Sequence, residues 1–316
     1  MTPPASGAMV ACIRGTMQTM QLGMFAEGKK RVRDDVPGVR VGTCGYSYRD
    51  WIGPFYPPGT KPRDMLEYYA REFAAVEIDS TYYRVPSAKT FASMAERTPK
   101  GFLFSVKLPG AATHLPADAT VLPREVREFR TALEPLAESG KLACGLMQFP
   151  NSFKPSANAE KRLRALRRAL PELPLVAEFR HRDWQSHATL ELLAELGIGW
   201  CNVDMPHFSK LLRESADATS RIAYVRFHGR NVKQWWRPET PDLRYDYLYS
   251  AEELEPWVDR VGDLRAEAGV RETLAFFNNH RSGQAVRNAE MFRAMLEARL
   301  AGRRSRASKK KAPATS

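Results

Sequence analysis

The stretch PLVAEFRHRDWQSHATLELLAELGIGWCNVD, residues 174–204, contains the pattern that decides the fold. A short apolar run at 174–180 is followed by helical apolar spacing at 186–196, and a second β-branched and aromatic run occupies 198–204. This order predicts a strand, a helix and a second strand. The two strands are expected to pair in parallel, because the helix carries the chain back to the end where the first strand began.

The same alternation repeats on both sides of this unit. Strands are expected at about 40–45, 75–79, 102–108, 143–149, 174–180, 198–204, 222–228 and 273–278. Helices are expected at about 62–74, 87–97, 123–139, 156–170, 186–196, 251–268 and 284–300, with the weakest helical signal in the short connection 205–220. No GxGxxG turn follows the first strand, which argues against an open dinucleotide-binding sheet. The sequence therefore predicts an α/β fold, a single-domain (β/α)8 barrel of TIM type over 37–301.

Composition and charge narrow the class of protein. The 316 residues are 43% hydrophobic and 27% charged, which excludes a mostly disordered chain. No apolar run reaches the roughly 18–20 residues that cross a bilayer, so no membrane partner is expected. The four cysteines form no CxxC pair, and the N-terminus lacks the apolar core of a signal peptide. Reduced thiols and a cytoplasmic location are the expectation.

The positive charge is concentrated at one end. The net charge is +12, and six basic side chains fall within 303–311. We expect residues 1–36 to be a disordered leader or the product of a start codon placed too early. We also expect a disordered basic tail at 302–316, because this tail has no apolar side chain larger than Ala or Pro and cannot form a core. The tail is a candidate for salt-sensitive contact with nucleic acid.

Strand alternation predicts which side chains face the barrel interior. In the second strand Val76 and Ile78 share one face, and Glu77 and Asp79 share the other. Helices cover the outside of a barrel, so the carboxylates are expected inside. The same reasoning places further polar residues inside, at the carboxyl ends of the strands: Ser105, Lys107, Gln148, Glu178, Arg180, Asn202, Asp204, Arg226, His228 and either Asn278 or Asn279.

This polar layer has two interpretations. Barrel enzymes place their active sites at the carboxyl ends of the strands, and the candidates for acid–base chemistry are Glu77, Asp79, Lys107, Glu178, Asp204 and His228. Alternatively, the charges pair with one another in a purely structural network.

Aromatic residues gather on the loops at the same end. Tyr46, Tyr48 and Trp51 follow the first strand, Tyr82 follows the second, and the segment 231–249 is rich in Trp and Tyr. These rings are suited to stacking on a planar ligand, although such loops also pack against each other. The length of 231–249 is typical of a lid.

Taken together, seven blocks resemble the signature blocks of domain of unknown function 72, the YecE-like proteins. They are GTCGYSYRDWIGPFYP (42–57), VEIDSTYYRVPS (76–87), FLFSVKLP (102–109), LMQFPNSF (146–153), AEFRHRDW (177–184), YVRFHGRN (224–231) and FFNNHRSGQAVRNA (276–289). The resemblance covers about 39–300 and departs from the usual pattern at Cys44. It implies a TIM-type barrel and no established reaction, substrate or cofactor.

Two ligand hypotheses follow from the polar layer. Glu178, Asp204 and His228 end successive strands and offer the donors that Mg²⁺, Mn²⁺ or Zn²⁺ accept, although Arg180 and Arg226 nearby oppose a cation. A divalent metal is therefore possible but not favoured, and the cofactor stays unknown.

The favoured hypothesis is a small anionic ligand. Glycines and arginines after strands seven and eight resemble the place where barrels bind phosphate. The expected ligand-binding residues are Tyr46, Tyr48, Trp51, Tyr82, His114, Gln148, Arg180, Arg226, Gly229, Arg230, Asn278, Arg281 and Gly283.

Two function classes remain. The first is an enzyme, a hydrolase or isomerase with carboxylate and histidine acid–base chemistry, acting on a phosphorylated or otherwise anionic ligand with a planar ring, such as a nucleotide, sugar phosphate or nucleic-acid end. The second is a non-catalytic nucleic-acid-binding protein that uses the rim aromatics and the basic tail.

Overall fold

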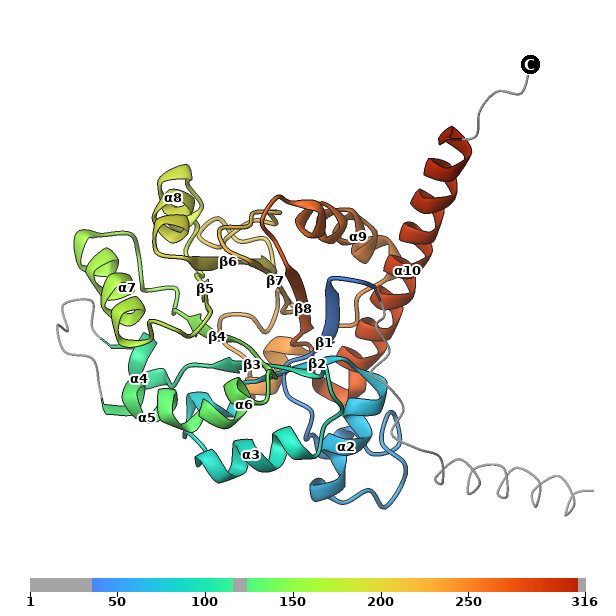
Figure 1. Ribbon diagram of the computed structural model, residues 1–316, viewed down its shortest axis with the longest axis horizontal. Coiled ribbons are helices and arrows are strands. Elements are labelled where there is room, and N and C mark those ends of the chain that lie inside the picture. Colours follow the sequence, from blue (N-terminus) through green and yellow to red (C-terminus); the bar gives the residue numbers. More distant parts are fainter. Residues whose placement is uncertain (1–35, 116–123, 312–316) are drawn as a thin grey trace, which may run out of the picture. The chain divides into compact units, whose positions relative to one another are not determined.

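A computed structural model describes residues 36–115 and 124–311, with side chains described as far as Gly302. Within these residues eight parallel strands alternate with helices everywhere except between the sixth and seventh strands, which confirms the TIM-type barrel (Figure 1). The strands are β1 (Val39–Thr43), β2 (Ala75–Ile78), β3 (Leu103–Lys107), β4 (Leu142–Gln148), β5 (Leu175–Glu178), β6 (Ile198–Asp204), β7 (Ile222–Phe227) and β8 (Glu272–Phe277).

Helices cover the outside of the sheet. They are α2 (Pro62–Glu72), α3 (Ala88–Glu96), α4 (Gly110–Thr113), α5 (Arg124–Ala132), α6 (Glu134–Glu138), α7 (Ala157–Ala169), α8 (His187–Glu195), α9 (Ala251–Ala266) and α10 (Gln284–Lys311). Short 3-10 turns follow several strands: η2 (Arg49–Trp51), η3 (Ser80–Tyr82), η4 (Arg182–Trp184), η5 (Pro241–Tyr245) and η6 (Arg281–Gly283). Several helices begin at a serine cap, as Ser156 illustrates by accepting a hydrogen bond from the Ala159 amide.

The sheet runs β1-β8-β7-β6-β5-β4-β3-β2, all in parallel, and closes between β1 and β2. At this seam a single ladder bridge between described residues, Cys44 to Glu77, joins the two strands. Tyr69 of α2 supplies a further link, because its hydroxyl accepts from the Thr43 amide (2.9 Å) and donates to the Ala75 carbonyl (3.1 Å). The side chain of a helix thus completes the barrel's hydrogen bonding.

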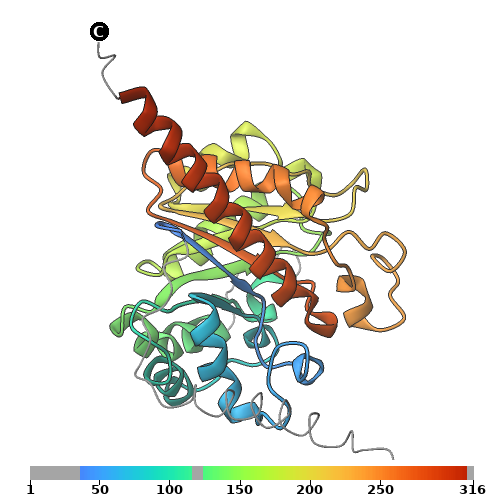
Figure 2. The ribbon, with the colours of Figure 1, turned by 90° about the vertical axis from the view of Figure 1, so that its right-hand side faces the viewer.

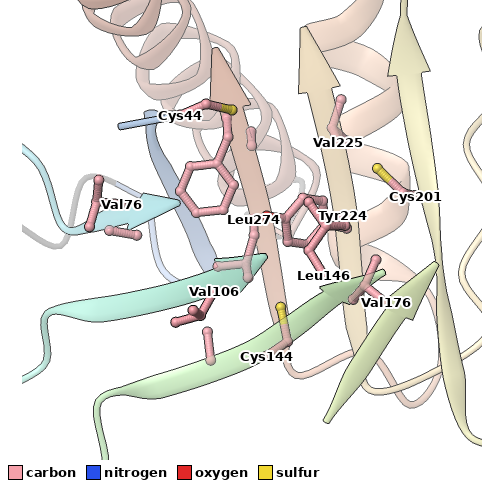
Figure 3. Packing of buried hydrophobic residues seen from close by; sticks show 14 of the residues in the cluster. Cys44, Val76, Val106, Cys144, Leu146, Val176, Cys201, Tyr224, Val225 and Leu274 are labelled. Atoms are coloured by element: carbon pink, nitrogen blue, oxygen red, sulfur yellow. The ribbon is translucent and has the colours of Figure 1, made fainter. Parts of the chain in front are cut away.

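The lower interior is apolar (Figure 3). Cys144, Cys201 and Leu274 are buried there beside the ring of Tyr224, whose hydroxyl reaches the polar layer above, and the two cysteines, together with Cys44, are free thiols. Cysteine behaves here as a small apolar side chain that fills the space between larger ones.

The connection from β6 to β7, residues 205–221, contains no helix in the structure. It coincides with the segment that has the weakest helical signal in the sequence. The loop lies over the outer face of β6, and its backbone bonds to the side chain of Asn202. This side chain accepts a hydrogen bond from the Asp217 amide and donates one to the Asp217 carbonyl, each with a length of 3.0 Å.

Helix α10 packs against β1, β8 and α9 and continues along the chain as far as Lys311 (Figure 2). It therefore enters the segment for which the sequence predicted disorder. Ala, Arg and Lys, which make up most of 301–311, are good helix formers and extend the preceding helix without a core of their own. The predicted leader lies outside the described residues except for Val36, and so does the end of the tail, 312–316.

Candidate active site at the mouth of the barrel

A buried network crosses the upper interior of the barrel. The guanidinium of Arg226, on β7, donates hydrogen bonds to two carboxylates. One is Glu178 of β5, and the other is Glu77 of β2 at a distance of 2.7 Å. The hydroxyl of Tyr224 donates to Glu77 across 2.7 Å. Each of these side chains is at most 2% exposed. We call Glu77, Glu178, Tyr224, Arg226 and His228 the buried network.

The charges of the network hold each other in place. Burial by itself raises the pKa of Glu178, but Arg180, Arg226 and His228 together hold that pKa well below its usual value. Burial likewise lowers the pKa of Arg226, and Glu178 and Glu77 outweigh it, so that the pKa ends well above its usual value. Glu178 is thus held ionised beside an arginine that also bonds Glu77, as expected for a structural ion-pair network.

His228 is a neutral member of this network. Burial, with a further contribution from Arg180, lowers its pKa to about 3. Its Nε2 lies 3.1 Å from Glu178 and its Nδ1 lies 3.1 Å from Nδ2 of Asn278. A neutral imidazole beside a carboxylate donates from Nε2, so Nδ1 accepts from the Asn278 amide. The amide nitrogen of Asn278 therefore points to His228, which leaves its carbonyl oxygen on the other side.

A cavity of about 590 Å³ opens above the network at the carboxyl ends of the strands. We call it the mouth cavity. Eight residues expected from the sequence line it: Asp79, Tyr82, Lys107, His114, Gln148, Arg180, Arg226 and Asn278. Of the six candidates for acid–base chemistry only Asp79 and Lys107 are among them, because Glu77, Glu178 and His228 are fully buried beneath.

Lys107 is the cation at the end of β3. Burial, followed by repulsion from Arg226, lowers its pKa to about 8. Its Nζ lies 4.5 Å from the centre of the Tyr82 ring. Within the described residues no carboxylate forms an ion pair with it, which is unusual for a partly buried lysine.

Arg244 is the second cation of the mouth cavity without an ion-pair partner in the described part of the chain, and its Nε has no hydrogen bond. It belongs to η5, in the long segment after β7. The length of this segment predicts a lid, but nothing in its sequence distinguishes Arg244 from its neighbours, because a loop carries no alternation from which a side-chain direction can be read.

Aromatic rings from the same segment wall the cavity. Trp235 is buried and its ring lies 5.8 Å from the guanidinium carbon of Arg180, and Tyr245 also lines the cavity. At the rim, Tyr83 is 88% exposed and Trp236 is 49% exposed. Aromatic side chains thus line the mouth cavity on the loops after β2 and β7, as the sequence predicted for these two loops.

The aromatic residues after β1 lie elsewhere. Trp51 is fully buried, and its Nε1 donates a hydrogen bond of 2.6 Å to the His280 carbonyl. The Tyr48 ring stacks on the His280 ring, with 4.7 Å between the ring centroids. The backbone carbonyl of Tyr46 accepts from Tyr56. None of Tyr46, Tyr48 and Trp51 lines the mouth cavity, because the loop folds back onto α2 and η6. Tyr48 and Trp51 position His280, which does line it.

The prediction that the polar side chains of β6 face the barrel interior is wrong. Asn202 and Asp204 point outward, and Asp204 accepts from Trp257 of α9 (2.7 Å) and from the Tyr249 hydroxyl (2.7 Å). Cys201 and Val203 instead face inward, in register with Tyr224 and Arg226 of β7. Polar groups are tolerated on the outer face of this strand, because no helix follows β6 directly and the surrounding loop and α9 provide hydrogen-bond partners.

The three suggested metal ligands are consequently not brought together. Asp204 lies on the outer face of β6, whereas Glu178 and His228 lie in the interior. Among the described residues no group of three or more His, Cys, Asp or Glu side chains is arranged to hold a metal ion.

The expected anion site after β7 and β8 is also not assembled. Arg230 makes a two-pronged contact with Asp204 (2.9 and 2.6 Å), and Arg281 pairs with Asp246. Gly229 and Gly283 have φ of +82° and +73° and form tight turns, and neither lines the mouth cavity. The cations that reach the cavity are Lys107, Arg180, Arg226 and Arg244.

Comparison with known proteins agrees with the fold. A family model described as "Protein of unknown function DUF72" matches residues 40–314. The chain belongs to the DUF72 family. A DUF72 structure from Thermotoga maritima is 40% identical, with a TM-score of 0.73 over 82% of this chain and 99% of that one. A second DUF72 structure, from Enterococcus faecalis V583, is 24% identical with a TM-score of 0.71, over 82% of this chain and 95% of that one, and supports the fold.

A curated bacterial protein is similar to the chain over most of its own length. The UPF0759 protein YunF of Bacillus subtilis (strain 168) is 28% identical to this DUF72 chain in an alignment of 282 positions, which covers 84% of this chain and 96% of that protein. No helix in the described part of the chain is both long and apolar enough to span a membrane.

Proposed function

We propose that the mouth cavity binds a small anionic ligand with a planar ring and performs acid–base chemistry on it. The observation that carries the proposal is the pair Lys107 and Arg244. Both line one cavity and neither has a carboxylate partner among the described residues, whereas Arg226 beneath them forms ion pairs with both Glu77 and Glu178. Burying a cation without a partner costs free energy, and an anionic ligand that pairs with it in the cavity offsets that cost.

The rings around these cations indicate the shape of the ligand. Tyr82, Trp235 and Tyr245 present apolar surface within the same cavity, and Gln148 and Asn278 add amide groups. Such a combination of apolar walls and a few polar groups is typical of small-molecule sites. A nucleotide or a sugar phosphate attached to a ring has the charge and the flat surface that these walls complement.

Acid–base chemistry falls to Lys107 and Asp79. A pKa of about 8 places Lys107 near the range in which a group both gives and takes a proton at neutral pH. Asp79 follows β2, lines the same cavity and forms no ion pair within the described residues. Glu77, Glu178 and His228 hold Arg226 and Asn278 in position from below.

The test compares phosphorylated compounds with their dephosphorylated forms. Mononucleotides and ring-bearing sugar phosphates are expected to raise the melting temperature of the protein, and the corresponding nucleosides and sugars are not. Arg244→Gln and Lys107→Met should each weaken the best ligand about tenfold, or about 1.4 kcal/mol. Arg237→Gln, an exposed arginine of the same segment outside the cavity, is the matched control and should bind normally. Equal affinity for phosphorylated and dephosphorylated forms would contradict the proposal.

A second candidate function is binding of a nucleic-acid end. The exposed rings of Tyr83 and Trp236 at the rim favour it, because every base offers a face on which such rings stack. The six basic residues of 303–311 would then contact phosphates.

A further inference from the structure

We propose that Lys107 forms an imine with a carbonyl group of the bound ligand, so that the substrate class of the mouth cavity is an aldehyde or ketone that also carries an anionic group. This inference rests on the proposed function, because the cavity must first bind the anionic part of the ligand.

Two of the carboxylates whose charge acts on the Lys107 amine are already engaged, and another, Asp79, lines the mouth cavity. Glu77 and Glu178 both accept hydrogen bonds from Arg226. Glu178 also lies 2.7 Å from Nε of Arg180 and 3.1 Å from Nε2 of His228. A lysine that serves only structure normally ends on such a carboxylate. Here the two arginines take both of them, and the amine of Lys107 is left at the cavity surface.

The amine is held at a defined place. Lys107 ends strand β3, and its backbone carbonyl accepts a hydrogen bond from Thr81 of η3 over 2.5 Å. The Tyr82 ring lies beside the amine, and the His114 ring meets the Tyr82 ring edge-on with 5.0 Å between centroids. The end group is therefore flanked by rings rather than by counter-ions.

This setting suits a nucleophilic amine. A lysine becomes nucleophilic when it is desolvated or lies beside another cation, because either condition favours the neutral amine. Lys107 is partly buried in a cavity that Arg180 and Arg226 also line, and burial together with Arg226 lowers its pKa to about 8. An arginine at this position would share the charge but could not form the bond.

The remaining cations and Asp79 complete the chemistry. Arg244 is free to meet the anionic group of the ligand. The neutral amine of Lys107 adds to the carbonyl carbon, and a proton passes from nitrogen to oxygen to give a carbinolamine. Loss of one water molecule then forms the C=N bond. Asp79, which lines the same cavity, is placed to accept and return the protons of these steps.

Pyridoxal 5′-phosphate is a suitable probe, because it combines an aldehyde, a planar ring and a phosphate. The full chain is incubated with a substoichiometric amount, reduced with borohydride to fix any imine as a secondary amine, and analysed by peptide mass spectrometry. We expect most of the label on the peptide that contains Lys107. The exposed Lys154 and Lys161 report nonspecific reaction. Labelling of these two to the same extent as Lys107 overturns the inference.

Three controls separate the causes. Lys107→Arg should lose the label without transferring it to another lysine. Arg244→Gln should slow labelling by the phosphate ester but not by pyridoxal, which has no phosphate. Pyridoxine 5′-phosphate, which has an alcohol instead of the aldehyde, should bind both the natural protein and Lys107→Arg, and should protect Lys107 from the probe. Binding of this alcohol without any labelling of Lys107 overturns the imine and leaves the proposed function standing. Absence of both overturns both.

Discussion

Oε1 of Glu77 lies 2.7 Å from Nη2 of Arg226, a contact that joins β2 to β7 through the barrel interior. Both side chains are at most 2% exposed. The second carboxylate on the same guanidinium, Glu178, comes from β5. The side chain of Arg226 thus connects β7 to β2 and β5, and no two of these three strands are neighbours in the sheet. Arg226 also lines the floor of the mouth cavity.

Replacement of Glu178 by Gln should destabilise the protein. The change keeps the shape but removes the charge that balances Arg180 and Arg226. Breaking a buried ion pair from one side costs about 3–5 kcal/mol, because the other charge stays buried. Urea unfolding of the variant measures this loss. The exposed Glu172→Gln is the control and should unfold like the natural protein. A Glu178→Gln variant of unchanged stability that fails to bind ligand would show that Glu178 belongs to the binding site itself.

Much of the barrel could be predicted from sequence, since strand and helix periods repeat with short connections. The inward placement of Glu77, Glu178 and Arg226 followed from alternation, because on these strands the apolar residues faced the helices. The same rule was wrong for Asp204. It assumes that polar side chains seek the interior layer, whereas β6 has a loop and α9 outside it that provide Trp257 and Tyr249 as donors.

Most of the predicted lining residues lie on or directly after strands, and two further ones, Tyr82 and His114, were predicted on the loops after β2 and β3. Lys107 and Arg180 come from strand ends, and their direction follows from the register. Arg244 and Trp235 come from the segment after β7, whose path depends on tertiary contacts such as the pair Arg281 and Asp246. Sequence spacing contains no record of such contacts.

Replacement of Asp204 by Asn tests the outward orientation of this residue. The carboxylate accepts from Arg230, Tyr249 and Trp257, so the variant should lose at least about 1.5–3 kcal/mol, the value of one hydrogen bond to a charged group. Ligand affinity in the mouth cavity should not change. Asp263→Asn, on the exposed side of α9, is the control for stability. Lost ligand binding at unchanged stability would place Asp204 in the site.

His228 should make the protein less stable in acid. Its folded pKa of about 3 lies below the unfolded value of 6.5, so between these values the unfolded chain binds one proton more than the folded chain. The free energy of unfolding therefore falls as pH falls from 6.5, by up to about 1.4 kcal/mol per pH unit. His228→Gln should remove this part of the slope, and His187→Gln, which changes an exposed histidine, should not. Unfolding measured from about pH 7 to pH 5 keeps most carboxylates ionised. Identical slopes for the natural protein and His228→Gln would contradict the assignment of a buried neutral imidazole.

The charge of Lys107 should make anion binding depend on pH. The ammonium form exists below its pKa of about 8, so affinity for a phosphate ester without a carbonyl should weaken as pH rises through that value. The phosphate itself does not change charge there, because its second pKa is about 6. Lys107→Arg stays charged and should bind with an affinity that is flat over the same range. Titration calorimetry with pyridoxine 5′-phosphate measures both. A natural protein whose affinity is equally flat would show that Lys107 does not meet the anion.

Removal of the basic end of the chain should separate the barrel from contact with nucleic acid. Truncation after Ala301 deletes the six basic residues of 303–311, while the contacts of α10 with β1 and β8 come from its earlier turns. We expect an unchanged melting temperature, unchanged binding of small anionic ligands and weaker binding of a labelled DNA oligonucleotide at low salt. Each phosphate contact releases counterions, so the truncated chain should also show a shallower dependence of affinity on salt. Fluorescence anisotropy over a series of salt concentrations measures both effects. If the truncated chain binds DNA with the same affinity and the same slope, the contact lies at the rim, and Tyr83→Ala and Trp236→Ala should then abolish it, because these two rings are exposed aromatic surface at the mouth cavity.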